Sequence, residues 1–111
     1  MNNTIQEKSF RFAVRIVNLC RYLQSEQKEY ILTKQLLRCG TSIGANVAES
    51  QQAQSRPDFI SKLNIALKEA YETNYWLRLL HETRYLKQDE FQSIIHDSKK
   101  SKKCWFLSSN L

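Results

Sequence analysis

The side chains of this 111-residue sequence that could carry out acid–base or metal chemistry are few and scattered. The two histidines, His81 and His96, each precede an acidic residue, and adjacent residues of a helix point to different sides. Glu69 and Glu72 would share a helix face, but carboxylate-bridged metal sites in bundles also need Glu-x-x-His pairs, so we interpret both as solvated carboxylates. Ser42 has no neighbouring base that would mark it as a nucleophile. The sequence therefore predicts a non-enzymatic protein with no catalytic residues, no metal and no cofactor.

The cysteines indicate a reducing compartment. Cys20, Cys39 and Cys104 are odd in number and far apart, and no C-x-x-C pair points to a zinc site. No secretory signal precedes the first helical pattern, and no apolar run approaches the roughly 20 residues that span a bilayer. We therefore expect a cytoplasmic protein without a membrane partner, in which Cys20 and Cys39 pack as small apolar groups.

Positive charge is concentrated near the C-terminus. Lys99, Lys100, Lys102 and Lys103 supply four of the six net positive charges, so the rest of the chain is nearly balanced. A basic tail on a balanced body is weaker evidence for nucleic-acid binding than the pI of 9.4 suggests. The candidate phosphate-binding residues are these four lysines together with the basic residues of the body: Arg11, Arg15, Arg21, Lys34, Arg38 and Arg78.

The elements that must position these residues are predicted to be helices. Two glycines and one proline are too few for the tight turns of a β-sandwich or barrel, and alternating Val/Ile/Thr runs are absent. Apolar residues recur every three or four positions, which predicts helices over about residues 5–24, 34–53 and 56–83, and a fourth from Gln88. The predicted fold is all-α, a single four-helix bundle domain over residues 1–111.

Capping residues predict where the helices begin and end. The polar segment Ser25–Tyr30 is expected to be the first connection, and Thr33 to cap the second helix. Ser55 can cap the third helix, and Pro57 suits its first turn. The fourth helix loses its apolar stripe in the lysine-rich segment 99–103, so we expect it to be short or frayed.

Small residues line one face of the second predicted helix. Gly40, Gly44 and Ala48 are spaced by four and leave a groove that a neighbouring helix could approach closely. Each glycine is unfavourable by roughly 1 kcal/mol relative to alanine in a helix interior. We interpret the groove as a site of tight packing, either within the bundle or between subunits.

The third helix carries more aromatic surface than one bundle seam needs. Tyr71, Tyr75 and Trp76 have three interpretations. They could be partly buried against neighbouring helices, they could form a subunit interface, where such residues are enriched, or they could stack on nucleic-acid bases.

The segment QLLRCGTSIGANVAE, residues 35–49, resembles a known family. It is similar to the pattern Q-L-x-R-(S/C)-(A/G)-x-S-I-x-x-N-(I/V)-A-E of four-helix bundle proteins encoded in intervening sequences of bacterial 23S ribosomal RNA genes. The likeness covers about residues 8–97. It implies an antiparallel up-down-up-down bundle that assembles as a homo-oligomeric ring, commonly a pentamer. A related protein, the accessory variability determinant of diversity-generating retroelements, binds nucleic acid.

The polar members of this motif are Ser42, Asn46 and Glu49. Asn46 and Glu49 would share a helix face, and we expect them to satisfy polar groups of an adjacent helix. The sequence departs from relatives at Ser50, where many carry glycine, and at Cys104-Trp105-Phe106, where the apolar spacing of the fourth helix is altered.

Two functions remain open at the level of sequence. The resemblance and the basic residues favour a non-enzymatic oligomeric adaptor that binds the phosphates of RNA or DNA. The alternative is a scaffold for a protein partner without nucleic acid, motivated by the small-residue groove and the aromatic cluster.

Overall fold

Apolar residues at helical spacing give each segment of the chain one face that must be buried, and four helices bury these faces together. The structure, a computed structural model, describes the backbone of residues 4–109 and the side chains of residues 4–99. The helices are α1 (Ile5–Gln27), α2 (Leu32–Ser50), α3 (Arg56–Glu82) and α4 (Gln88–Ser109). Each contacts two neighbours, because α1 and α3 both lie against α2 and α4. This confirms the predicted all-α four-helix bundle.

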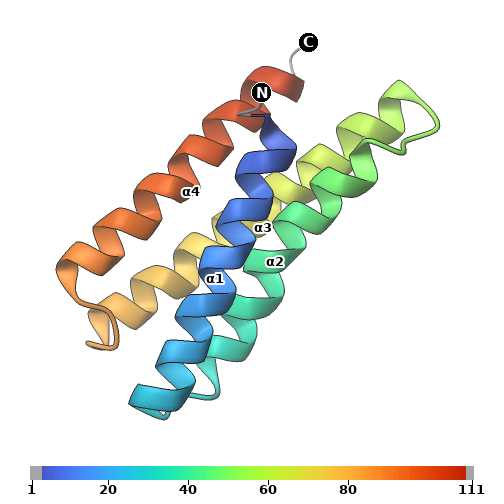
Figure 1. Ribbon diagram of the computed structural model, residues 1–111. Coiled ribbons are helices and arrows are strands. Elements are labelled where there is room, and N and C mark those ends of the chain that lie inside the picture. Colours follow the sequence, from blue (N-terminus) through green and yellow to red (C-terminus); the bar gives the residue numbers. More distant parts are fainter. Residues whose placement is uncertain (1–3, 110–111) are drawn as a thin grey trace.

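Successive helices run antiparallel (Figure 1). The α1–α2 and α3–α4 connections lie at one end of the bundle, and the α2–α3 connection lies at the other (Figure 1). The molecule measures 44 × 22 × 22 Å, about the length of α3 in its long dimension. Residues of neighbouring helices that are far apart in sequence therefore lie side by side along the whole rod.

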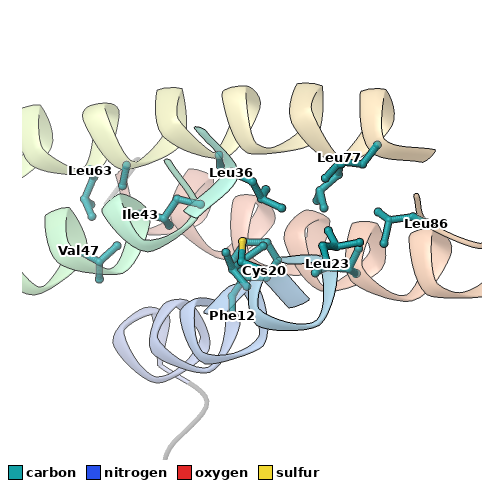
Figure 2. Packing of buried hydrophobic residues seen from close by; sticks show 14 residues of the cluster. Phe12, Cys20, Leu23, Leu36, Ile43, Val47, Leu63, Leu77 and Leu86 are labelled. Atoms are coloured by element: carbon teal, nitrogen blue, oxygen red, sulfur yellow. The ribbon is translucent and has the colours of Figure 1, made fainter. Parts of the chain in front are cut away.

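Among the described side chains, the core is one cluster between the helices. Its largest members have almost no exposed surface, and Figure 2 shows them directed toward one another. The cluster comprises Phe12, Ile16, Cys20, Leu23, Leu36, Ile43, Val47, Leu63, Ala66, Ala70, Leu77, Leu80, Leu86 and Ile94. Burial of a leucine- or isoleucine-sized side chain stabilises the fold by about 1.5–3 kcal/mol. The apolar residues whose spacing predicted the helices therefore also hold the helices together.

The start of α3 agrees with the sequence prediction. The hydroxyl of Ser55 accepts a hydrogen bond of 3.2 Å from the backbone N–H of Asp58, and Pro57 lies in the first turn. The side chain of Thr4 caps α1 in the same way, accepting from the N–H of Glu7 at 3.1 Å.

The predicted cap of α2 is wrong. Thr33 lies inside α2 and is buried, and the helix begins at Leu32. Instead, the carboxylate of Glu29, which is 6% exposed, accepts hydrogen bonds from three successive backbone N–H groups. The donors are Ile31 at 2.8 Å and Leu32 and Thr33 at 2.9 Å each. Sequence reasoning missed Glu29 because a long side chain reached the helix start from within the connection, outside the usual capping position.

The expectation that the fourth helix is short or frayed is also wrong. The backbone of α4 stays helical through the lysine-rich segment to Ser109. Lysine is a good helix former, so a helix backbone can continue where its apolar stripe stops. The side chains of Lys100, Lys102 and Lys103, and those of Cys104-Trp105-Phe106, lie outside the described residues.

Two basic residues adopt left-handed backbone conformations in the connections at one end of the bundle. Lys28, with φ 57°, ends α1, and Arg84, with φ 72°, follows α3. Side chains disfavour this region, whereas glycine enters it freely. We predict that Lys28→Gly or Arg84→Gly raises the free energy of unfolding by about 0.5–1 kcal/mol. Urea denaturation measures the free energy of unfolding of each variant. Lys87→Gly is the control, because Lys87 has no positive φ and its replacement should not raise the free energy of unfolding. Equal stability of all three variants would contradict the prediction.

Candidate nucleic-acid interface

Two of the predicted phosphate-binding arginines on α1 are engaged with carboxylates. Arg15 Nη1 lies 2.6 Å from Asp97 Oδ2 of α4, and Arg15 Nη2 donates a 2.7 Å hydrogen bond to the hydroxyl of Ser93. Arg11 pairs with Glu7 one turn earlier at 3.0 Å. Arg15 thus joins α1 to α4, and Arg11 is held within its own helix.

Arg38 joins α2 to α3. Its guanidinium binds the carboxylate of Glu72 and lies 3.3 Å from that of Glu69. Glu72 also accepts a 3.0 Å hydrogen bond from the indole N–H of Trp76. The interpretation of Glu69 and Glu72 as solvated carboxylates is therefore wrong, because both pair with the same arginine of the neighbouring helix.

Other basic side chains form no ion pair within the part of the chain whose side chains the structure describes. Arg21, Lys34, Arg78 and Lys99 of the predicted set are exposed and belong to this group. Five further exposed cations, which the sequence analysis did not single out, share this property: Lys28, Arg56, Lys68, Arg84 and Lys87. Among the predicted cations whose side chains the structure describes, Arg15 and Arg38 thus join helices, Arg11 pairs within α1, and the remaining four face solvent without an ion pair.

Exposed aromatic and basic side chains are brought together along α3. Lys68, Tyr71, Tyr75 and Arg78 are spaced by three, four and three residues, so they lie along one face of the helix. We call these four residues the α3 stripe. Tyr71 is 62% exposed and Tyr75 58%. The sequence contains a signal for Lys68, because it lies three residues before Tyr71 and therefore on the same face of the helix.

Trp76 is oriented differently from the two tyrosines. It is half-buried against the core cluster, and its indole N–H is fixed by Glu72. Its ring meets that of Tyr75 edge-on, with centroids 5.0 Å apart and an angle of 79° between the planes. Of the interpretations weighed for this cluster, partial burial describes Trp76, while Tyr71 and Tyr75 remain largely exposed.

The small-residue groove of α2 is filled by α1 of the same chain. A Cβ atom on Gly40 would lie 2.8 Å from Ile16 Cγ2, and one on Gly44 would lie 3.3 Å from the backbone oxygen of Ser9. Glycine is therefore required at Gly40 by a side chain and favoured at Gly44 by a close backbone approach. Ala48, the third small residue, is exposed.

The polar motif residues divide between two roles. The amide of Asn46 donates to the backbone oxygen of Ser42 at 2.9 Å and to its hydroxyl at 3.1 Å, within α2. Glu49 pairs with Lys62 of α3 at 3.0 Å. The expectation that both Asn46 and Glu49 serve an adjacent helix therefore holds for Glu49 and is wrong for Asn46, whose amide donates within α2.

The residues considered for catalysis do not converge. His81 stacks on Phe91 with ring centroids 4.3 Å apart, and His96 is exposed on α4. Among the described residues, no group of three or more His, Cys, Asp or Glu side chains could hold a metal ion. In the same part of the chain, every helix is too short or too polar to cross a membrane.

Cys20 and Cys39 are buried free thiols. Burial, reinforced by Cys39 and Glu29, raises the pKa of the Cys20 thiol to about 12, and burial also raises the pKa of Cys39. Because Cys20 ionises near pH 9.0 when unfolded, its stabilising contribution is present below pH 9 and is lost as the pH rises toward 12.

We therefore predict that the stability advantage of the wild-type protein over Cys20→Ala shrinks between pH 8 and pH 10. Urea denaturation of both proteins under reducing conditions measures this difference. Ionisable groups that do not interact with Cys20 titrate equally in both proteins, so parallel pH profiles would contradict the prediction.

The fold and the distribution of side chains define a helical bundle with a partly cationic surface. The sequence profile of the 23S rRNA-intervening sequence protein family matches residues 1–105, and the chain belongs to this family. It is similar to the crystal structure, at 1.70 Å, of a protein of unknown function from the S23 ribosomal protein family of Bacteroides thetaiotaomicron VPI-5482. The two share 54% sequence identity over 97% of this chain and 100% of the other, with a TM-score of 0.95. No curated protein matches this sequence.

Proposed function

We propose that this protein is a non-enzymatic, oligomeric adaptor that binds the phosphates of RNA or DNA in the bacterial cytoplasm. One observation carries the proposal. The carboxylates of Glu49, Glu69, Glu72 and Asp97 bind cations of neighbouring helices, while nine exposed cations have no ion pair among the described side chains. An outer surface with unpaired cations attracts phosphate without sequence preference.

The proposal assigns different roles to the predicted basic residues. Arg21, Lys34, Arg78 and Lys99 are exposed and unpaired, and they are the proposed phosphate contacts. Arg15 and Arg38 bridge helices, and moving them to a phosphate would break those bridges. Because of their positive charge, we also propose phosphate contacts for Lys100, Lys102 and Lys103.

Fluorescence anisotropy with labelled RNA and DNA at increasing salt tests this proposal. Each phosphate contact contributes about 0.7–0.9 to the slope of log affinity against log salt. The triple variant Arg21→Gln/Lys34→Gln/Arg78→Gln should bind more weakly and with a shallower slope. Arg11→Gln, which removes an exposed charge already paired to Glu7, is the matched control and should keep the slope. Absence of salt-dependent binding by the wild-type protein would refute the proposal.

We propose that a second copy covers the outer face shared by α1 and α2. Phe10 is 67% exposed and Val14 45%. Phe10 lies on α1 beside the close approach at Gly44, and Val14 lies one turn further along α1. Ala45 and Ala48 are exposed on α2. The face thus combines projecting apolar side chains with small ones and carries no charge in these positions, as the centres of subunit interfaces do. The family resemblance implies five subunits.

Light-scattering mass on size-exclusion chromatography tests this assembly. Phe10→Glu should reduce the wild-type oligomer to smaller species, because it would bury a charge in the interface. Tyr22→Glu is the control, since Tyr22 lines the α4 side of α1 with Leu19 and Ile94. A wild-type monomer, or an oligomer indifferent to Phe10→Glu, would exclude this interface.

The alternative function, a scaffold for a protein partner without nucleic acid, is favoured by the α1–α2 connection. Ile31 is 78% exposed there and Tyr30 is exposed beside it. If the wild-type protein bound no nucleic acid at low salt while Ile31→Asp abolished capture of a defined partner, the scaffold would replace the adaptor.

A further inference from the structure

We infer that the α3 stripe binds single-stranded nucleic acid by stacking bases on Tyr71 and Tyr75, with Lys68 and Arg78 contacting the flanking phosphates. The inference rests on the proposed nucleic-acid function and narrows it to one face and one form of nucleic acid. Exposed aromatic rings between cations are the combination that single-strand binding proteins use, since every base has a face on which a ring can stack.

The spacing of the tyrosines favours a single strand over a duplex. Tyr71 and Tyr75 are four residues apart on α3, which places their Cα atoms about 6 Å apart along the helix axis. Successive base pairs of a duplex are separated by about 3.4 Å and have their faces covered by stacking. A base can meet each ring only where the strand is opened and extended. Unstacked bases of this kind are the usual targets of aromatic side chains in RNA recognition.

Contacts with α2 orient the second tyrosine before any ligand binds. The ring of Tyr75 packs edge-on against Trp76, the indole N–H of Trp76 donates to Glu72, and Glu72 is bound by Arg38. Because Trp76 is also packed against the core, this chain of contacts restricts the motion of the Tyr75 ring. A restricted ring loses less conformational entropy on binding. Arg38 is thus a positioning residue for the stripe and does not contact phosphate.

Electrostatics agree with this assignment. Glu69 and Glu72 are the carboxylates nearest the stripe in sequence, and both pair with Arg38, which offsets one of their two negative charges. Together with Lys68 and Arg78, this group of side chains keeps a net positive charge. Lys68 and Arg78 are ten residues apart, about 15 Å along α3, and neither has an ion pair among the described side chains. The polyanion would meet two available cations separated by two exposed rings.

A shallow hollow of about 730 Å³ continues the surface toward the start of α3. It is lined mainly by apolar groups, with Ile60 and Ile65 among them, and it includes Arg56 and Lys68. Since Lys68 belongs to both the hollow and the stripe, a strand leaving Tyr71 would pass over an apolar surface to a further cation, Arg56. The α3 surface thus offers a continuous path longer than the two tyrosines alone.

Anisotropy with fluorescein-labelled oligo-dT and oligo-rU, and with a duplex of equal length, tests the inference on the full-length protein. Tyr71→Ala and Tyr75→Ala should each weaken single-strand affinity on the order of 10-fold. Tyr71→Phe and Tyr75→Phe should retain the affinity because the ring remains. Tyr30→Ala, which removes an exposed tyrosine from the α1–α2 connection, is the matched control and should bind as the wild type does.

Further variants separate the roles within the stripe. Lys68→Gln and Arg78→Gln should each lower the salt slope by about 0.7 on a single strand. Arg38→Gln should weaken single-strand binding while leaving that slope unchanged, because it acts through the orientation of Tyr75. A reduced slope for Arg38→Gln would overturn its positioning role.

The outcomes distinguish this inference from the proposed function. Salt-dependent wild-type binding with unchanged affinity in Tyr71→Ala/Tyr75→Ala would overturn the stripe and leave the adaptor proposal standing. Tighter binding of duplex than of either single strand would overturn it in the same way. If the wild-type protein bound none of the three probes at low salt, both proposals would fail. Circular dichroism of each variant confirms that affinity changes do not arise from unfolding.

Discussion

Gly40→Leu is expected to lower the free energy of unfolding by about 3 kcal/mol or more. A Cβ atom at this position would already lie 2.8 Å from Ile16 Cγ2 and 3.0 Å from Ile16 Cγ1, and leucine adds three more carbons. Ile16 is fully buried, so it has no solvent-filled space into which it could move. Overpacking of this kind is unfavourable by about 1–3 kcal/mol or more, a large part of the 5–15 kcal/mol that stabilises a typical domain. Thermal unfolding followed by circular dichroism measures the loss.

The matched experiment is a double-mutant cycle between Gly40 and Ile16. Gly40→Ala alone should destabilise the protein, although alanine favours a helix by about 1 kcal/mol over glycine. In the Ile16→Ala background the clashing Cγ atoms are gone, so the same change should be neutral or stabilising. If Gly40→Ala stabilised the wild-type background as well, α1 and α2 would not be as close as described.

Glu29→Ala is expected to lower the free energy of unfolding by about 2–4 kcal/mol, because three backbone N–H groups at the start of α2 lose a charged acceptor. The N–H of Thr33 is buried, so water cannot readily replace the carboxylate there. Glu29→Gln keeps an acceptor oxygen and should fall between Glu29→Ala and the wild type. Urea denaturation measures all three proteins.

Glu26→Ala provides the control for this prediction. Glu26 is exposed and lies three residues before Glu29, so its removal changes the charge of the same region without touching the start of α2. Its stability should stay within about 0.5 kcal/mol of the wild type. Equal stability of Glu26→Ala and Glu29→Ala would show that the carboxylate does not cap α2.

Local signals accounted for the helices, and their failures had local reasons. Ser55 and Pro57 identified the start of α3 because capping depends on residues within one turn. The start of α2 escaped prediction because Glu29 reaches it from the connection. The spacing of apolar side chains also failed to predict the length of α4, because the backbone stays helical beyond Lys99 although the sequence there is polar.

The candidate interface depended on contacts that no sequence spacing contains. Arg15, Arg38 and Arg78 are equivalent in the sequence, as basic residues of amphipathic helices. The partners of Arg15 and Arg38 lie 82 and 34 residues further along the chain, at Asp97 and Glu72. No periodicity predicts such pairs, so the sequence alone predicts the same phosphate-binding role for all three arginines.

By itself, the sequence determined four helices, one buried seam and membership of a family, because periodicity, capping and motif similarity are properties of neighbouring residues. Only the tertiary structure decided which cations remain available to a partner and which groove is already filled. The physical reason is that antiparallel packing brings distant charges and surfaces together. Arg38 is paired with a carboxylate of α3, and α1 fills the Gly40–Gly44 groove. The side chains of the α3 stripe, in contrast, stay exposed: Lys68, Tyr71, Tyr75 and Arg78.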